Sequence, residues 1–277
     1  MNSKRQVTAG AGRPGLAKKK PPAKGSPAKS KAETQPYFTL EGLRFLRGLA
    51  RNNNRDWFNA RKPVYEVEIK RPMLAVIEAV TGAMMDFAPG HVRAPESIMM
   101  RIYRDTRFSN NKLPYKPHVS AWWVHDGLQK TSGAGFYLHI SGKQVEIAAG
   151  AFMPDVEQLR AIRRFLLEHH QEYRKVAQAR GLRRLFSKDE GGEPLSRSPK
   201  GFPAEHPAAA LFRQKRWGFG ASLLPETATR PDFAKTVASY FRAASPLVAL
   251  LNRPLLVAKE RPRRDWPSGH MRLWREW

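Results

Sequence analysis

The stretch Ala134–Phe152, AGFYLHISGKQVEIAAGAF, decides the fold class that we expect. Apolar and polar side chains alternate on both sides of Gly142-Lys143, which predicts two antiparallel strands joined by a two-residue turn with a positive φ at Gly142. The alternation places one set of side chains on the core face: Phe136, Leu138, Ile140, Val145, Ile147 and Ala149. It places a second set on the opposite face: Tyr137, His139, Ser141, Gln144 and Glu146. In this register His139 lies opposite Glu146, within reach of a hydrogen bond.

The segments around this hairpin set the rest of the architecture. Two more strand candidates precede it, SIMMRIYR at 97–104 and HVSAWWVH at 118–125. Helical spacing of apolar residues occupies the sequence before and after the strands, at 37–87, 154–181 and 230–252. We expect the second of these helices to stop at Gly181 and the last to be a pair broken near Pro246. Consecutive strands with short links pair antiparallel. The sequence therefore predicts an α+β fold, an antiparallel β-meander sheet (about residues 97–150) packed by N-terminal and C-terminal helices.

Composition divides the 277-residue chain into three parts. Residues 1–36 are rich in Lys, Ala and Pro and contain no aromatic side chain, so we expect a disordered basic tail. Residues 37–252 have the apolar content of a single α+β domain, and residues 253–277 form a basic, Trp-containing C-terminal extension. Of the net charge of +25, the tail holds +8 and the extension +4, which leaves +13 on the domain. A basic domain attracts nucleic acid, acidic surfaces or phosphorylated small molecules.

Residue types and motifs exclude several classes of protein. The absence of cysteine excludes disulfides, thiolate nucleophiles and cysteine-based zinc sites. No apolar run approaches the ~20 residues of a transmembrane helix, and the N-terminus lacks the apolar segment of a signal peptide. We therefore expect a cytoplasmic protein with no membrane partner. His118 and His125 are seven residues apart and face opposite sides of a strand, so we expect no metal site. No motif points to a particular cofactor or oligomeric state.

The stretch Arg101–Lys116, RIYRDTRFSNNKLPYK, concentrates fixed charge beside aromatic rings. If its first half continues a strand, alternation puts Arg101, Asp105 and Arg107 on one side and Arg104 on the other. The guanidinium fork suits a carboxylate or a phosphate, and one aspartate cannot neutralise several arginines. We therefore predict an anion site with these ligand-binding residues: Arg101, Arg104, Arg107, Lys112, Tyr115 and Lys116.

Carboxyl and imidazole groups are the candidates for catalysis. Asp105 would orient an arginine or act as a base, and His139 with Glu146 would form a general-base pair. The competing interpretation is structural, with the charges of Arg101–Lys116 bracing the loop and His139–Glu146 making a cross-strand contact. An exposed concave site favours the functional interpretation, and arginines satisfied within the loop favour the structural one.

The residues of this stretch also resemble a family signature. Within RIYRDTRFSNNK the resemblance rests on seven positions: Arg101, Arg104, Asp105, Arg107, Phe108, Asn111 and Lys112. The segments NNNRDWFNARKPVYE, LPYKPH, GFYLHI, AAGAFMP and KGFPAEHP are similar too. On these grounds the chain from about Phe38 to about Asn252 is identified as a member of a bacterial conserved-hypothetical family, domain of unknown function 2461. The resemblance implies a shared site at Arg101–Lys112 and implies no particular chemistry.

Three hypotheses about function follow. The first is an Arg/Asp/Lys-lined pocket that binds an anionic, phosphorylated small ligand, with enzymatic activity left open. The second is non-specific nucleic-acid binding through residues 1–36 and the basic domain, with Trp122, Trp123 or Tyr103 as stacking surfaces. The third is an interaction scaffold in which the charged stretch is a structural ion-pair network. The Gly-rich stretch Gly218–Ser222 is a further phosphate-loop candidate, although no helix start with Lys follows it.

Overall fold

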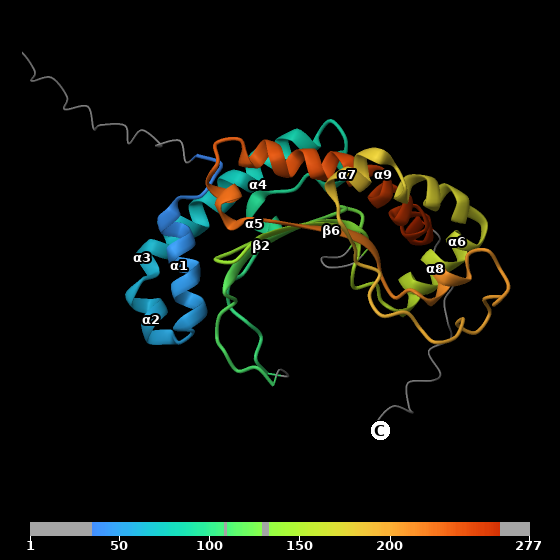
Figure 1. The fold of residues 1–277 in the computed structure, drawn as a ribbon, viewed down its shortest axis with the longest axis horizontal. Helices are drawn as coiled ribbons and strands as arrows, with labels where there is room; N and C mark the ends of the chain where they lie inside the picture. Colours follow the sequence, from blue (N-terminus) through green and yellow to red (C-terminus); the bar gives the residue numbers. More distant parts are fainter. Residues whose placement is uncertain (1–34, 108–109, 129–132, 261–277) are drawn as a thin grey trace, which may run out of the picture. The chain divides into compact units, whose positions relative to one another are not determined.

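The computed structural model describes residues 35–107, 110–128 and 133–260 (Figure 1). Phe108 of the signature, most of the predicted disordered tail and the tryptophans of the C-terminal extension lie outside the described residues. Among the described residues, no helix is both long and apolar enough to cross a membrane.

The described strands form one antiparallel sheet, which confirms the α+β prediction. Its order is β1-β2-β3-β4-β6-β5, so the first four strands make the predicted meander and β6 pairs with β4. The strands are β1 (Met99–Met100), β2 (His118–Val124), β3 (Gly135–Ser141), β4 (Val145–Ala151), β5 (Lys188–Asp189) and β6 (Trp217–Leu223).

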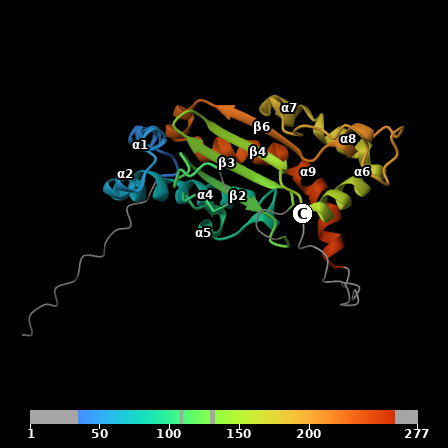
Figure 2. The same cartoon turned by 90° about the horizontal axis from the view of Figure 1, so that it is seen from below.

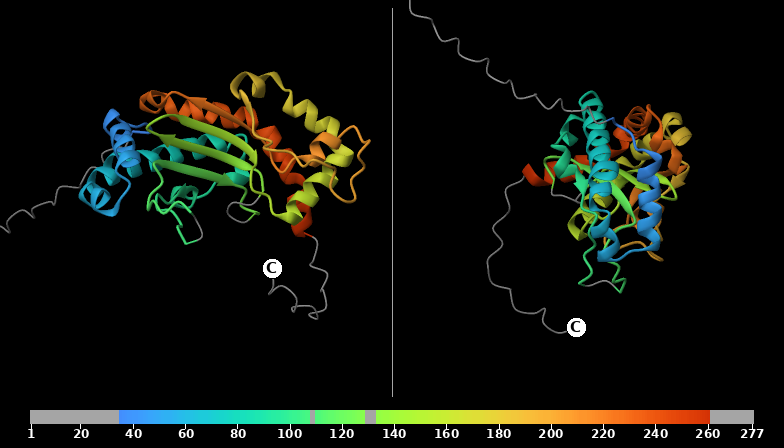
Figure 3. Two further views of the ribbon diagram at one scale, coloured as in Figure 1. Left: turned by 60° about the horizontal axis from the view of Figure 1, so that its bottom comes forward. Right: turned by 90° about the vertical axis from the view of Figure 1, so that its left-hand side faces the viewer.

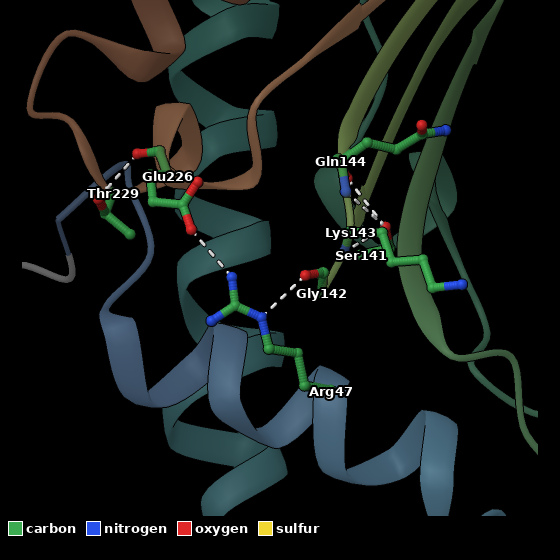
Figure 4. A network of polar contacts seen from close by, with 7 residues as sticks. All are labelled: Arg47, Ser141, Gly142, Lys143, Gln144, Glu226 and Thr229. Carbon is green, nitrogen blue, oxygen red and sulfur yellow. Dashed lines mark hydrogen bonds and ion pairs between the residues drawn. The ribbon is translucent and has the colours of Figure 1, made fainter.

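The central hairpin has the predicted register. His139 lies opposite Glu146, and all six side chains assigned to the core face are buried. The prediction of a positive φ at Gly142 is wrong, since this glycine is not among those with a left-handed backbone. A Cβ at Gly142 would lie 2.4 Å from Cγ of Arg47, so the glycine is needed for close approach. Arg47 Nε donates to the Gly142 carbonyl over 2.9 Å, and its Nη2 pairs with Glu226 (Figure 4).

The N-terminal helices begin at side-chain caps. The Thr39 hydroxyl accepts from Gly42 N, and the Asn54 side chain accepts from Trp57 N. One π-helical turn, η1, precedes the long helix of this group. The elements are α1 (Leu40–Arg51), α2 (Arg55–Ala60), α3 (Lys62–Tyr65), η1 (Glu66–Lys70), α4 (Arg71–Met84), η2 (Pro89–His91) and α5 (Pro95–Ile98).

The predicted strand at 97–104 is shorter than expected. Residues 97–98 belong to α5, and only Met99 and Met100 pair with β2. Ile98 and Ile102 are both buried, although neither of them pairs with β2. After Met100 the chain leaves β2 and forms a β-bridge between Tyr103 and Tyr115.

The C-terminal half differs from the prediction at the end of its first long helix and at Gly218–Ser222. Helix α6 (Val156–Ala177) begins with a capping box made by Asp155 and Gln158, but it ends before Gly181, which lies inside α7 (Arg180–Leu185). The short helices α8 (Ala209–Arg213) and η3 (Pro225–Thr229) flank β6. Gly218–Ser222 is part of β6 and pairs with β4, so it is not a phosphate loop.

Helix α9 (Phe233–Glu260) is continuous through Pro246, so the predicted helix pair is wrong. Leu247 and Val248 are buried directly after this proline. Their burial offsets the single backbone hydrogen bond that the proline removes.

Helices α4 and α9 cover one face of the sheet, while the opposite face has no helical cover in Figures 1 and 2. On the covered face Trp123 packs on Phe241 with ring centroids 5.1 Å apart and donates to the Thr81 hydroxyl. Trp123 is fully buried, so it cannot stack on nucleic acid as the second hypothesis proposed. We call the uncovered side the open face.

Candidate functional site

A cleft of about 650 Å³ lies on the open face. Strand register aligns two rows of side chains across its floor. The polar row is Ser120, His139, Glu146 and Ser222. The neighbouring row is Trp122, Tyr137, Ala148 and Gly220. Residues of two segments line the cleft, the one between β1 and β2 and the one between β5 and β6. These segments are joined to opposite edges of the sheet, as the ribbon in Figure 3 shows.

Glycines in β6 make room for side chains that lie on the floor. A Cβ at Gly218 would lie 2.8 Å from Cζ of Phe152, and a Cβ at Gly220 would lie 2.6 Å from Oε1 of Glu190. Phe152 and Glu190 both line the cleft. The Gly-rich composition of β6 therefore serves the close approach of an aromatic ring and a carboxylate to the sheet.

The charged stretch is a two-stranded ribbon whose base is fixed to the helices. Arg104 N donates to the Pro114 carbonyl over 2.9 Å, and Lys116 N donates to the Ile102 carbonyl over 2.8 Å. The Asn53 side chain bonds the backbone of Tyr115 twice: its Nδ2 donates to Tyr115 O over 2.9 Å, and its Oδ1 accepts from Tyr115 N over 3.0 Å. The α1–α2 turn thereby holds the residue next to Lys116.

Arg104 and Lys116 line the cleft, and their side chains make no hydrogen bond or ion pair with another residue that the structure describes. Burial lowers the pKa of Lys116, and the positive charges of Arg101 and Arg104 lower it further. No carboxylate contributes to this shift. The two side chains are therefore a partly desolvated pair of cations at one end of the cleft.

In contrast to Arg104 and Lys116, the side chains of Asp105 and Arg107 are paired with each other. Arg107 Nε donates to Asp105 Oδ1 over 3.0 Å, and Arg107 Nη2 donates to Asp105 Oδ2 over 2.7 Å. Hydrogen bonds from Arg107 lower the pKa of Asp105 to about 2. This exposed pair has the bidentate geometry of a brace, and the low pKa makes Asp105 a weak proton acceptor.

The remaining predicted ligand-binding residues lie elsewhere. Arg101 lines a second cavity of about 390 Å³ beside η1. Lys112 Nζ donates to the Thr106 carbonyl within the ribbon. Tyr115 is 3% exposed and stacks on Phe58 with ring centroids 4.1 Å apart. The fold thus brings Arg104, Asp105 and Lys116 to the cleft, whereas the other members of the predicted set do not line it.

The histidines of the open face are neutral near pH 7. His118 lines the cleft and stacks on His139 with ring centroids 4.0 Å apart. Burial lowers the pKa of His118 to about 3, with further effects from His139, Lys116 and Arg104, and burial lowers the pKa of His139 to about 4. His139 Nδ1 lies 3.7 Å from Glu146 Oε2 and 3.5 Å from the Tyr137 hydroxyl. Because His139 is uncharged at neutral pH, its contact with Glu146 is not an ion pair there.

Sequence reasoning did not assign His118, Glu190 or Arg216 to this site. The even spacing of His118, Ser120 and Trp122 places them on one face of β2, a signal that was present in the sequence. Glu190 and Arg216 come from the segment before β6, and no local pattern places that segment on the sheet. Within the described parts of the chain, no three His, Asp or Glu side chains are grouped to hold a metal ion.

Residues 41–249 match the family model described as a conserved hypothetical protein, DUF2461. The match spans most of the chain, so the protein belongs to this family, as the resemblance predicted. No curated protein and no solved structure matches the chain.

Proposed function

We propose that the cleft binds an anionic small molecule, in particular a phosphorylated one, through Arg104 and Lys116. The observation that carries the proposal is that both cations line a cleft of about 650 Å³ and lack a partner within the described chain. Buried or half-buried charges are normally paired, because removing an unpaired charge from water is costly. An anion in the cleft would supply the missing partner.

Phosphate suits this pair of groups for two physical reasons. A guanidinium fork donates two parallel hydrogen bonds to phosphate oxygens, and an ammonium adds a point charge. Bound anion would also offset the like-charge repulsion that lowers the pKa of Lys116. Asp105 is engaged with Arg107, so its carboxylate offers limited competition for Arg104.

A reaction in the cleft would draw on the groups of the floor. His139 and Glu146, with His118 stacked above, are the candidates for proton transfer, because they adjoin the cleft and His139 is unprotonated at neutral pH. Asp105, with its pKa of about 2, would position Arg107 instead of acting as a base.

The test is calorimetric titration of the full chain with pyrophosphate and ribose 5-phosphate at low and high salt. Charge-assisted hydrogen bonds are worth about 1.5–3 kcal/mol, so Arg104→Leu and Lys116→Met should each weaken binding about tenfold or more. Arg164→Leu is the matched control, because Arg164 is exposed on α6 and does not line the cleft.

Three results would decide the matter. Salt-resistant binding that is lost in Arg104→Leu but kept in Arg164→Leu supports the proposal. Binding of DNA or RNA alone, which vanishes at high salt and requires residues 1–36, would replace it with the nucleic-acid hypothesis. No binding of any anion to the folded wild type would leave the ribbon as a structural element.

A further inference from the structure

The end of the cleft opposite Arg104 and Lys116 also carries unpaired charge. Glu190 lies over Gly220 of β6, and Arg216 directly precedes β6. Neither side chain makes a hydrogen bond or ion pair with another residue in the described ranges. One acceptor and one donor are therefore available at this end, without an internal partner.

The two charged ends are separated by the width of the floor. Lys116 lies just before β2, and Glu190 lies over β6, with β3 and β4 between these strands. Three interstrand spacings amount to about 14 Å. A lone phosphate or sulfate cannot span this distance, so a ligand that uses both ends must be extended.

The middle of the cleft is aromatic and apolar. Trp122 contacts Tyr137 and Phe152, with ring centroids 6.1 and 6.0 Å apart, and Ala148 keeps the floor flat between them. All four residues line the cleft. Aromatic walls of this kind favour a planar ring, which buries apolar area and stacks at low entropic cost.

The cleft therefore has a cationic end, an aromatic middle and a second end with Glu190 and Arg216. From this arrangement we infer that the ligand is a phosphorylated compound with a planar amino-substituted ring, of the nucleoside monophosphate class. Its phosphate binds Arg104 and Lys116. Its ring lies against Trp122, its amino group donates to Glu190, and a neighbouring ring nitrogen accepts from Arg216. The inference rests on the proposed anion site and adds the identity of the ligand's other end.

The experiment separates the two ends with probes that each contain one part. Adenosine carries the amino ring without phosphate, ribose 5-phosphate carries the phosphate without the ring, and AMP and CMP carry both. We expect AMP or CMP to bind the full chain at least about tenfold more tightly than ribose 5-phosphate does. Glu190→Gln should remove most of that gain while leaving ribose 5-phosphate binding unchanged.

A matched variant controls for charge. Glu193→Gln changes an exposed carboxylate of the same loop that does not line the cleft, so it should behave as the wild type. Arg104→Leu should weaken AMP and ribose 5-phosphate by the same factor and leave adenosine unaffected, because it removes only the phosphate contact.

Each outcome has a distinct meaning. Equal affinity for AMP, CMP and ribose 5-phosphate would overturn the inference and leave the anion site standing. A gain for AMP or CMP that survives Glu190→Gln would also overturn it, and so would a gain that Glu193→Gln removes as fully as Glu190→Gln does. If neither pyrophosphate nor any of the phosphorylated probes binds the folded wild type, both the anion site and this inference fail.

Discussion

The two faces of the sheet are built from the same strands and have opposite chemistry. On β2 and β3 the covered face presents Val119, Trp123 and Leu138, which are buried. The open face presents His118 and His139 from the same strands, one of them in a cleft. Burial of apolar side chains on the covered face stabilises the fold. This stabilisation offsets the free-energy cost of partly burying polar groups on the open face.

This difference between the faces predicts which substitutions affect stability and which affect binding. Changes on the covered face should reduce the free energy of unfolding, whereas changes on the open face should alter binding and titration. Four experiments test this division, from the largest expected effect on stability to the smallest.

Truncation of adjacent tryptophans compares the faces directly. Trp123→Ala removes a fully buried ring and leaves the Thr81 hydroxyl without its donor, so we expect a loss of about 3–5 kcal/mol in urea unfolding. Trp122→Ala removes a ring that is 8% exposed but lines the cleft, and it breaks no hydrogen bond of the indole, so we expect a smaller loss of about 2–3 kcal/mol. Equal losses would show that both faces carry stability.

Acid should destabilise the protein through three histidines. The pKa of His91 is lowered to about 4, that of His118 to about 3 and that of His139 to about 4, in each case chiefly by burial. In the unfolded chain these histidines bind protons as the pH falls through about 6.5. In the folded chain they stay neutral until the pH approaches their lowered pKa values. The stabilisation is therefore complete above pH 6.5 and decreases as pH falls toward 4, by about 3 kcal/mol per pH unit between pH 6 and 5.

A double variant assigns this pH dependence to the open face. His118→Asn with His139→Asn leaves only His91 of the three, so the slope measured by urea unfolding should fall to about one third, near 1 kcal/mol per pH unit. An unchanged slope would mean that the two stacked imidazoles titrate normally in the folded protein.

Loss of the Asn53 clamp should loosen the ribbon more than the domain. Asn53→Ala removes two hydrogen bonds to the Tyr115 backbone, so we expect a cost of about 1–2 kcal/mol. Hydrogen exchange should accelerate at the amides of Arg104 and Lys116. Asn52→Ala is the control, because the Asn52 side chain bonds only the nearby Gly48 carbonyl. Equal acceleration in both variants would argue against a specific clamp.

Breaking the exposed brace should have the smallest effect. Asp105→Asn removes the carboxylate charge that pairs with Arg107, and both side chains are solvent-exposed. We expect the thermal midpoint to stay within about 2 °C of the wild type. Phosphate probes should bind slightly more tightly at low salt, because the ribbon gains net positive charge. A large drop in the midpoint would assign the ribbon a structural role instead.

Much of the fold could be predicted because its signals are local. The alternation around Gly142 determines the hairpin register, and the caps Thr39, Asn54 and Asp155 determine where helices begin. Strand β6 was not predicted, because its glycines make room for the side chains of Phe152 and Glu190, which are distant in sequence. The break predicted near Pro246 does not occur, because burial of the neighbouring residues outweighs the tendency of proline to end a helix.

The sequence by itself determined the α+β class, the family and the concentration of charge at Arg101–Lys116. Only the tertiary structure decided which of those charges share a cleft. It pairs Arg107 with Asp105, turns Arg101 toward another cavity and leaves Arg104 and Lys116 facing the floor. The physical reason is that alternation and capping act over a few residues. The direction of an arginine in a ribbon depends instead on contacts such as that of Asn53 with Tyr115, 62 positions away.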